Sequence, residues 1–283
     1  PVRLEVERGG ELLERDFVVQ DLNSITPARY LQFGDAVVHD LSYQMGRHMN
    51  APLRGVFVAN PGYSLGAAGV PRGAVISNVA GQEVESLDEF ERAIAVLPDG
   101  ARVALRYSTL DDPRGSQTRV MRMDRRWFEA LDCTRDDSAG YWSCHDLAEP
   151  PPAVPPAPAR TSFATTGDPL VDRLAPSLVL VNFDMPFSVA GVTERSYHGT
   201  GVIVDAGRGL VAVDRNTVPV AVGDVRLTFG GSVEVPGRVE YVHPLHNVAI
   251  VSFDPTLLDG TPIRAASFDP RPLEAGEAVT VVG

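Results

Sequence analysis

The chain begins with alternating hydrophobic and polar residues, the pattern of half-buried β-strands. Residues Val2–Glu7 and Glu14–Val19 alternate in this way on either side of Gly9-Gly10. A glycine pair between two such runs favours a tight turn. We therefore expect a β-hairpin within residues 1–22.

The clearest helix signal lies at residues 86–96. Ser86 can cap the first turn, and Glu89 follows three residues later, which together make a capping box. Apolar residues then recur on one helical face, at Leu87, Phe90, Ile94 and Leu97. Strand-like runs surround this helix at Ala36–Val38, Gly55–Ala59, Ala74–Val79, Val103–Tyr107 and Thr118–Met123, and Leu41–Met49 has the pattern of one or two helical turns. This order predicts an α+β domain over residues 23–127.

A proline-rich stretch separates this region from the rest of the chain. Glu149–Pro158 reads EPPPAVPPAP. Proline has no backbone N–H and a fixed φ, so the stretch favours an extended, exposed spacer over a helix or a central strand. A ligand segment for an SH3 or WW domain is the alternative interpretation. We assign residues 128–168 to a loop and this linker.

Short apolar runs follow one another closely after the linker. They lie at Leu178–Phe183, Gly201–Asp205, Gly209–Val213, Val225–Phe229, Val233–Val242, Val248–Phe253 and Ala278–Val282. Turn-forming residues separate them, and no clear helical pattern intervenes. Short strands at this spacing predict a β-barrel or a β-sandwich over residues 169–283. The fold class is thus mainly β, with one α+β domain.

The charge balance limits the classes of partner. The formal net charge is −12, with 37 acidic residues against 25 lysines and arginines. Nucleic acids and anionic membranes attract cationic surfaces, so neither is expected as a partner. No apolar run approaches the roughly 18 residues that span a bilayer as a helix. We therefore expect no membrane-spanning helix.

The two cysteines, Cys133 and Cys144, do not make a disulfide framework. We expect two free thiols, with a disulfide inside the loop as the alternative. His243 and His246 flank Pro244, which prevents helical spacing, and no further ligand completes a metal set. We predict no metal and no other cofactor.

The second region resembles the N-terminal barrel of the HtrA (Deg-type) serine proteases, which have the chymotrypsin fold. The similarity begins at HGTGVIVDAGRGLVAVD, His198–Asp214, and continues through VDRNTV and HPLHNVAIV. In that family the catalytic histidine and aspartate occupy the positions that fall here on Asn216 and Asn247. A carboxamide cannot act as a general base near neutral pH, because it does not titrate there. The resemblance therefore implies no catalytic residue in this barrel. A displaced base at His198, His243 or His246 is the less favoured alternative.

The first region resembles an HtrA-type PDZ domain. RYLQFGDAVV, LRGVFVANPG and RGAVISNVAGQEV match its loop and strands in order, with Arg72-Gly73-Ala74 in place of the usual glycine–aspartate. In the family a carboxylate-binding loop precedes the strand that grips a peptide, and a helix forms the other wall of the groove. The implied peptide-binding residues are Gln32, Phe33, Gly34, Asp35, Ala36, Leu87, Phe90, Glu91 and Ile94. Asp35 departs from expectation, since a carboxylate there would repel a peptide C-terminus. A PDZ fold that only packs against a neighbouring domain is the alternative.

The motifs as a set resemble the double-HtrA branch, the Nma111-like and Deg7-like proteins. Members carry an active protease half, PDZ domains and a degenerate protease half. The resemblance implies a fragment of a longer protein, in which residues 1–22 close a preceding PDZ domain. Its function would be regulatory, peptide-binding and scaffolding within proteolysis and protein quality control.

The implied partners are peptides or unfolded segments, other domains of the same chain and a homo-oligomer. The alternative is a non-proteolytic interaction module or holdase. Relatives span the nucleus, the chloroplast lumen and the bacterial envelope, so no compartment is predicted.

One motif points to different chemistry. Gly62–Gly66 reads GYSLG, which matches the nucleophile elbow of α/β-hydrolases. That elbow needs a strand-to-helix turn in a doubly wound sheet, and this chain has no run of βαβ units. We interpret Ser64 as part of a PDZ surface loop.

Overall fold

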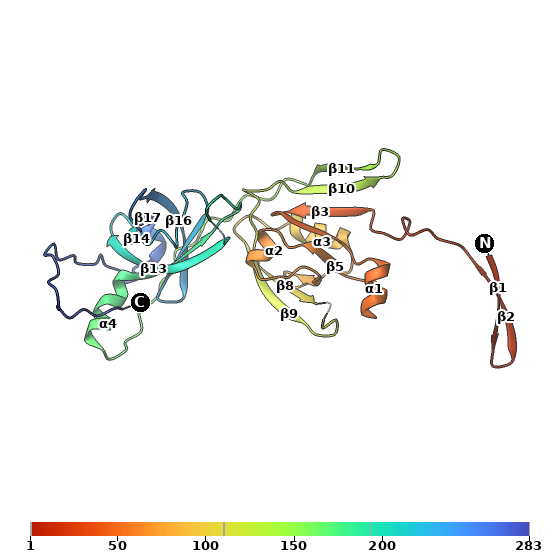
Figure 1. Cartoon of the computed structure of the whole chain (residues 1–283), viewed down its shortest axis with the longest axis horizontal. Helices are drawn as coiled ribbons and strands as arrows, with labels where there is room; N and C mark the ends of the chain where they lie inside the picture. The colour runs from red at the N-terminus through yellow and green to blue at the C-terminus, as the bar shows by residue number, and fades with distance from the viewer. Residues whose placement is uncertain (1, 110, 193, 283) are drawn as a thin grey trace. The chain divides into compact units, whose positions relative to one another are not determined.

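The computed structural model describes residues 2–109, 111–192 and 194–282. The predicted hairpin region begins at residue 1 and the predicted barrel region ends at residue 283, and these two end residues lie outside the described residues. The chain divides into two compact units, Pro1–Val154 and Pro155–Gly283. The point of division falls within the proline-rich stretch. Figure 1 shows the helices and strands of both units.

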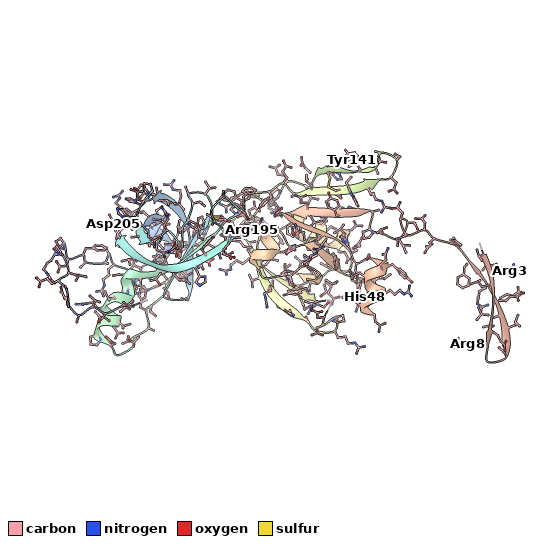
Figure 2. The ribbon with its side chains drawn as sticks, in the orientation of Figure 1. Arg3, Arg8, His48, Tyr141, Arg195 and Asp205 are labelled. Atoms are coloured by element: carbon pink, nitrogen blue, oxygen red, sulfur yellow. A yellow bond between two sulfur atoms is a disulfide. The ribbon has the colours of Figure 1, made fainter. Side chains whose placement is uncertain are left out.

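The chain starts with the expected hairpin. Strands β1 (Val2–Arg8) and β2 (Glu11–Phe17) are antiparallel, and both turn glycines, Gly9 and Gly10, have positive φ. The pairing register places five apolar residues on one face together with Arg15, while Leu12 lies on the other face. The five apolar residues are Val2, Leu4, Val6, Leu13 and Phe17. Nearly all of the hairpin's side chains are exposed, including those of Arg3 and Arg8, which Figure 2 labels.

The first unit is built on one antiparallel sheet, ordered β11-β10-β3-β4-β5-β6-β8-β9, with β7 paired to β6. Its strands are β3 (Arg29–Phe33), β4 (Ala36–Asp40), β5 (Val56–Asn60), β6 (Val75–Val79), β7 (Gln82–Glu83), β8 (Arg102–Ser108), β9 (Gln117–Arg122), β10 (Leu131–Asp136) and β11 (Tyr141–Asp146). The helices are α1 (Tyr43–Met49), α2 (Ser64–Ala67) and α3 (Leu87–Ala95). Strands β10 and β11 lie within residues 128–168, where the sequence predicts a loop and a linker.

Helix α3 packs its apolar face onto this sheet. Leu87, Phe90 and Ile94 are buried in the same core as residues of β3, β4, β5, β6 and β8. The prediction of a helix with one apolar face between strands is confirmed. This arrangement puts α3 next to β3 and β4, where the family resemblance expects a peptide groove.

The second unit is a closed barrel of six antiparallel strands, ordered β12-β13-β14-β17-β16-β15. The strands are β12 (Leu178–Asp184), β13 (Ser196–Asp205), β14 (Leu210–Val213), β15 (Asp224–Phe229), β16 (Val233–Val242) and β17 (Ala249–Phe253). Short helical turns lie at α4 (Pro169–Leu174), η1 (Ala175–Ser177) and η2 (Pro255–Leu258). The prediction of a mainly β chain with a barrel is confirmed.

The expected strand at Ala278–Val282 is not formed, so that prediction was wrong. Val279 and Val281 are exposed instead. A strand needs a partner edge for its backbone groups, and a closed barrel has none to offer. Alternating apolar residues were therefore not sufficient to make a strand here.

The proline-rich stretch has no regular secondary structure. On its N-terminal side, the Val154 N–H donates to the carbonyl of Asp99 in the first unit. On its C-terminal side, the Ala159 N–H donates to the carbonyl of Leu257 in the second unit. Each end of the linker is thus fixed to its own unit.

Candidate peptide groove and degenerate triad positions

Helix α3 forms one wall of the candidate groove, and its first turn is tied to the sheet. The Ser86 hydroxyl accepts a hydrogen bond from the Glu89 N–H at 3.3 Å, and the Glu89 carboxylate accepts from the Glu85 N–H at 2.7 Å. Asp40, at the end of β4, accepts from the Leu87 N–H at 2.6 Å. These bonds satisfy backbone donors that a helix start leaves open, and they fix α3 beside β4.

Strand β4, which begins within the stretch Arg29–Val38 that the resemblance assigns to the carboxylate-binding loop, lies beside α3, and both of its edges are paired. It pairs antiparallel with β3 on one side and with β5 on the other. Of the residues implied for a carboxylate-binding loop, Gln32 and Phe33 lie in β3, and only Gly34 and Asp35 connect the two strands. Both connecting residues have positive φ, at 50° and 62°, as a tight two-residue hairpin turn requires.

The turn between β3 and β4 is fixed by its surroundings. The Gly34 carbonyl oxygen accepts hydrogen bonds from the backbone N–H groups of Tyr63 and Ser64, each at 3.0 Å. A Cβ at position 34 would lie 1.8 Å from the Ser64 hydroxyl oxygen, so a side chain does not fit there. Ser64, the serine of the GYSLG motif, is therefore a buried residue packed beneath this turn.

The implied groove residues come together, but as a closed core. Phe33 is 2% exposed and Leu31 is fully buried, and both pack in the cluster that contains Leu87, Phe90 and Ile94. The Phe33 and Phe90 rings lie 5.5 Å apart between centroids. Of the other implied residues, Ala36 is buried, and Gln32, Asp35 and Glu91 are half-buried.

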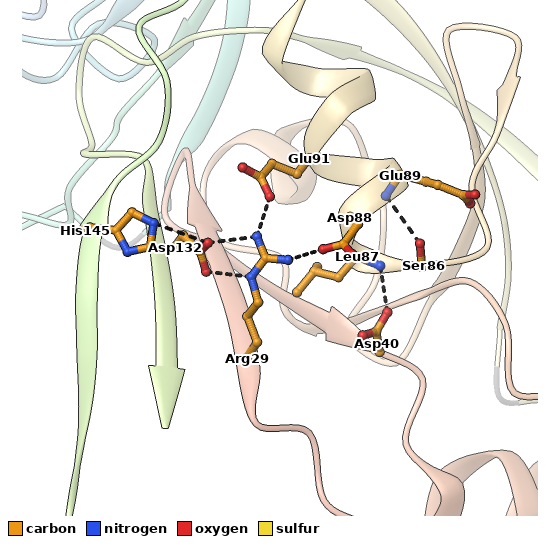
Figure 3. Close-up of polar contacts among 9 residues, drawn as sticks. All are labelled: Arg29, Asp40, Ser86, Leu87, Asp88, Glu89, Glu91, Asp132 and His145. Carbon is orange, nitrogen blue, oxygen red and sulfur yellow. Dashed lines mark hydrogen bonds and ion pairs between the residues drawn. The ribbon is translucent and has the colours of Figure 1, made fainter. Parts of the chain in front are cut away.

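Arg29, at the start of β3, links three elements (Figure 3). Its guanidinium bonds the carboxylate of Asp132 on β10 at 2.8 Å through two nitrogens, and it also bonds Asp88 and Glu91 on α3. The hydrogen bond to Asp132 raises the pKa of Arg29 above its usual value, against the opposing effect of burial. Arg29 is not among the site residues predicted from the sequence. A usable signal was present, because Arg29 is a cation at the start of an apolar strand and the first half of the predicted helix carries Asp88 and Glu91.

Strands β10 and β11 extend the sheet beyond β3. Strand β10 pairs with β3 along residues 131–134, and β11 pairs with β10. Cys133 and Cys144 lie directly opposite each other in that pairing and form a disulfide. The expectation of two free thiols was therefore wrong. The hairpin brings the cysteines together, and a hairpin was not expected in this stretch.

Asn216 and Asn247, to which the sequence resemblance assigns the catalytic histidine and aspartate, lie in the loops after β14 and before β17. The Asn247 side-chain oxygen accepts a hydrogen bond from the Arg215 N–H at 2.8 Å, next in sequence to Asn216. The Arg215 guanidinium also donates to the carbonyl oxygens of His243 and Pro244, each at 2.9 Å. Arg215 and Asn247 thus join the loop after β14 to the loop before β17.

The structure shows the surroundings of His243 and His198, two of the three histidines named above as an alternative base. Nδ1 of His243 accepts hydrogen bonds from the N–H groups of Leu245 and His246, at 3.1 and 2.9 Å, which caps its own turn. His198 is exposed on β13. Within the described residues, no three His, Cys, Asp or Glu side chains gather as metal ligands. No helix in that part of the chain is long and apolar enough to cross a membrane.

Comparison with known proteins defines the class first. The sequence pattern of the PDZ-like domain matches residues 24–100, which cover the elements β3 to α3. The six-stranded closed barrel that follows is consistent with a chymotrypsin-like barrel. The protein therefore joins a PDZ-like domain to a barrel of the trypsin-like type.

Over its whole length the chain is homologous to fungal proteins of the Nma111 type. It is 34% identical to the pro-apoptotic serine protease NMA111 of Pyricularia oryzae and 35% identical to that of Yarrowia lipolytica. It is also 33% identical to a PDZ domain-containing protein of Schizosaccharomyces pombe. In each case all of this chain is matched, but it spans only 28–30% of the relative's length. The resemblance drawn from the sequence motifs is confirmed.

Proposed function

We propose that this chain is a regulatory and scaffolding part of an HtrA-type serine endopeptidase and that it does not itself catalyse peptide hydrolysis. The observation that carries the proposal is the hydrogen bond between Asn247 and the Arg215 backbone, beside Asn216. A serine nucleophile needs a titrating base that a third group orients. Asparagine supplies neither a base nor a negative charge, so these loops keep their geometry without the chemistry.

Peptide binding is the second part of the proposal. PDZ domains take up an extended peptide as an added strand along a sheet edge. In this chain the walls of such a site would be β4 and α3, with Leu87, Phe90 and Ile94 as the apolar lining. Hydrophobic or misfolded segments are the substrate class that this lining suits, and their capture would serve a protease elsewhere in the longer protein.

The N-terminal hairpin suggests how the fragment joins its neighbours. One face of β1–β2 is largely apolar, although it includes Arg15, and the other carries mostly charges, and a two-stranded hairpin is marginally stable alone. We propose that Val2, Leu4, Val6, Leu13 and Phe17 close the sheet of a preceding PDZ domain. A longer protein that includes the upstream sequence should bury these side chains.

The proposal is tested by incubating the repurified chain with casein, with trypsin as the positive control. We expect no cleavage above the buffer rate. Cleavage that survives repurification and disappears in His243→Ala or His246→Ala would contradict the proposal and reveal a displaced base. The holdase alternative predicts that the chain suppresses aggregation of a heat-denatured reporter enzyme at equimolar concentration, which the scaffolding role does not require.

A further inference from the structure

The slot between β4 and α3 is already filled by the chain's own strand β3. Strand β3 runs antiparallel to β4, as an added peptide would, and its alternate side chains meet the helix side. We infer that β3 is the resident ligand of the PDZ groove, and that the groove selects a segment with a basic residue, an apolar residue and an aromatic residue at alternate positions. This inference rests on the peptide-binding part of the proposed function.

Each of the three alternate side chains of β3 has a matching place. Phe33 packs against Phe90 in the core, and Leu31 is fully buried in the same cluster. Arg29 reaches the carboxylates of Asp88 and Glu91 at the N-terminal half of α3. A groove with an apolar floor and an acidic end is complementary to the pattern Arg-x-Leu-x-Phe.

The outer edge of β3 is also occupied. Strand β10 pairs with it, Asp132 of β10 bonds Arg29, and Tyr30 packs edge-on against Trp142 of β11 with ring centroids 5.0 Å apart. The disulfide then joins β10 to β11. Strand β3 is therefore held along both edges, so an outside peptide reaches the groove only when β3 leaves it.

The end of the resident segment differs from a free peptide end. Phe33 continues into Gly34, and the Gly34 carbonyl takes the N–H groups of Tyr63 and Ser64. The N–H groups of Tyr63 and Ser64, which lie at the Phe33 end of the resident strand, thus already donate to the turn of this chain. A free C-terminal carboxylate from outside would have to displace the turn as well as the strand.

The test uses a fluorescent peptide with the sequence of residues 26–33, TPARYLQF, and a free carboxylate. Its control peptide carries alanine in place of the leucine and the phenylalanine. Fluorescence polarisation compares the wild-type chain with a double variant, Leu31→Ala with Phe33→Ala, which weakens the resident strand and leaves the groove walls intact. We expect the variant to bind the peptide at least about tenfold more tightly than the wild type, and to reject the control peptide.

A milder variant keeps the test decisive if the double variant does not fold. Arg29→Ala removes the link to α3 and β10 but no core side chain. Amide hydrogen exchange over residues 29–33 should become faster by about tenfold or more, and added peptide should bind this variant more tightly than the wild type. Arg92→Ala is the matched control, because it removes an exposed arginine of helix α3. It should leave the amide exchange of residues 29–33 unchanged.

The outcomes separate the two proposals. If the wild type binds the peptide as tightly as the variants while β3 stays protected from exchange, the resident-ligand inference is overturned and peptide capture stands. If neither the folded double variant nor Arg29→Ala gains affinity for the peptide, the inference is overturned as well. Neither result bears on the absence of catalysis, which the casein assay measures independently.

Discussion

The two units of this chain differ in different ways from the sites that the family resemblance implies, which are a peptide groove in the first unit and catalytic residues in the second. In the PDZ-like unit the walls of the groove are present, but β3 fills the space between them. In the barrel, the loops after β14 and before β17 are joined through Arg215 and Asn247, and we propose that Asn216 and Asn247 stand in place of a base and its orienting group. A filled groove can be emptied by a conformational change, whereas a missing base can be restored only by mutation. The comparison suggests that the first unit can be regulated and that the second is fixed in its role.

The largest expected effect is on the packing of the resident strand. Phe33→Ala should lower the free energy of unfolding of the first unit by about 3–5 kcal/mol, because it leaves a cavity against Phe90. Chemical denaturation followed by a probe in each unit measures this change. Val96→Ala, at a side chain that is 63% exposed, is the control and should cost little. A loss below about 1 kcal/mol for Phe33→Ala would mean that β3 is not packed as described.

The disulfide should give the next largest effect. Replacing Cys133 and Cys144 together with serine should destabilise the β10–β11 hairpin by up to about 2–3 kcal/mol, since the bridge closes a short loop of 11 residues in sequence separation. Hydrogen exchange over residues 131–146 measures it, with and without reductant on the wild type. Identical exchange in the double variant, the reduced wild type and the oxidised wild type would show that the β10–β11 hairpin does not depend on the disulfide.

Arg29 should matter less than the core but more than a surface cation. Arg29→Ala should cost about 1–3 kcal/mol, because it leaves the buried Asp132 without its guanidinium partner. Arg54→Ala removes an ion pair with Glu85 whose members are both exposed, and should cost no more than about 0.5 kcal/mol. Equal losses from the two variants, measured by thermal unfolding, would contradict the bridging role of Arg29.

The smallest effect is a pH dependence at Asp124. Burial alone would raise the pKa of this carboxyl, but the hydrogen bonds from Arg126 outweigh burial and hold the pKa below its ordinary value. Its contribution to stability is therefore complete above the unfolded-state pKa of about 3.9 and is lost as the pH falls through the lower folded-state pKa.

Asp124→Asn should accordingly lower the stability of the chain at pH 7 by about 1 kcal/mol, and the difference from wild type should shrink in acid. Unfolding midpoints between pH 7 and pH 2 measure this trend. Asp146→Asn, at an exposed position on β11, is the control. A difference that stays constant down to pH 2 would mean that the charge of Asp124 is not the cause.

Much of the fold could be predicted from local patterns. The capping box at Ser86 and Glu89 and the apolar face of Leu87, Phe90 and Ile94 identified α3, because helix starts and helix faces are encoded within a few residues. The six barrel strands could also be predicted locally, because each is a short apolar run bounded by turn-forming residues. Strand β16, expected at Val233–Val242, has those bounds in the structure.

The features that were missed depend on pairing between strands. Gly34-Asp35 lies between two alternating runs, as Gly9-Gly10 does, but it was interpreted as a carboxylate-binding loop. Asp35 adopts positive φ in the turn, which aspartate tolerates better than most residues, so the hairpin signal was present. The Cys133–Cys144 bridge depends on the register of β10 and β11, which cysteine spacing alone does not give.

The most direct test of the central claim is amide hydrogen exchange of strand β3 in the unmodified chain, without any peptide. We predict that the amides of residues 29–33 are protected to the same degree as those of β4, because both strands lie inside one sheet with neighbours on each side. Exchange of residues 29–33 as fast as that of the exposed turn at Gly9-Gly10 would contradict the claim, since the groove would then stand open to an outside peptide.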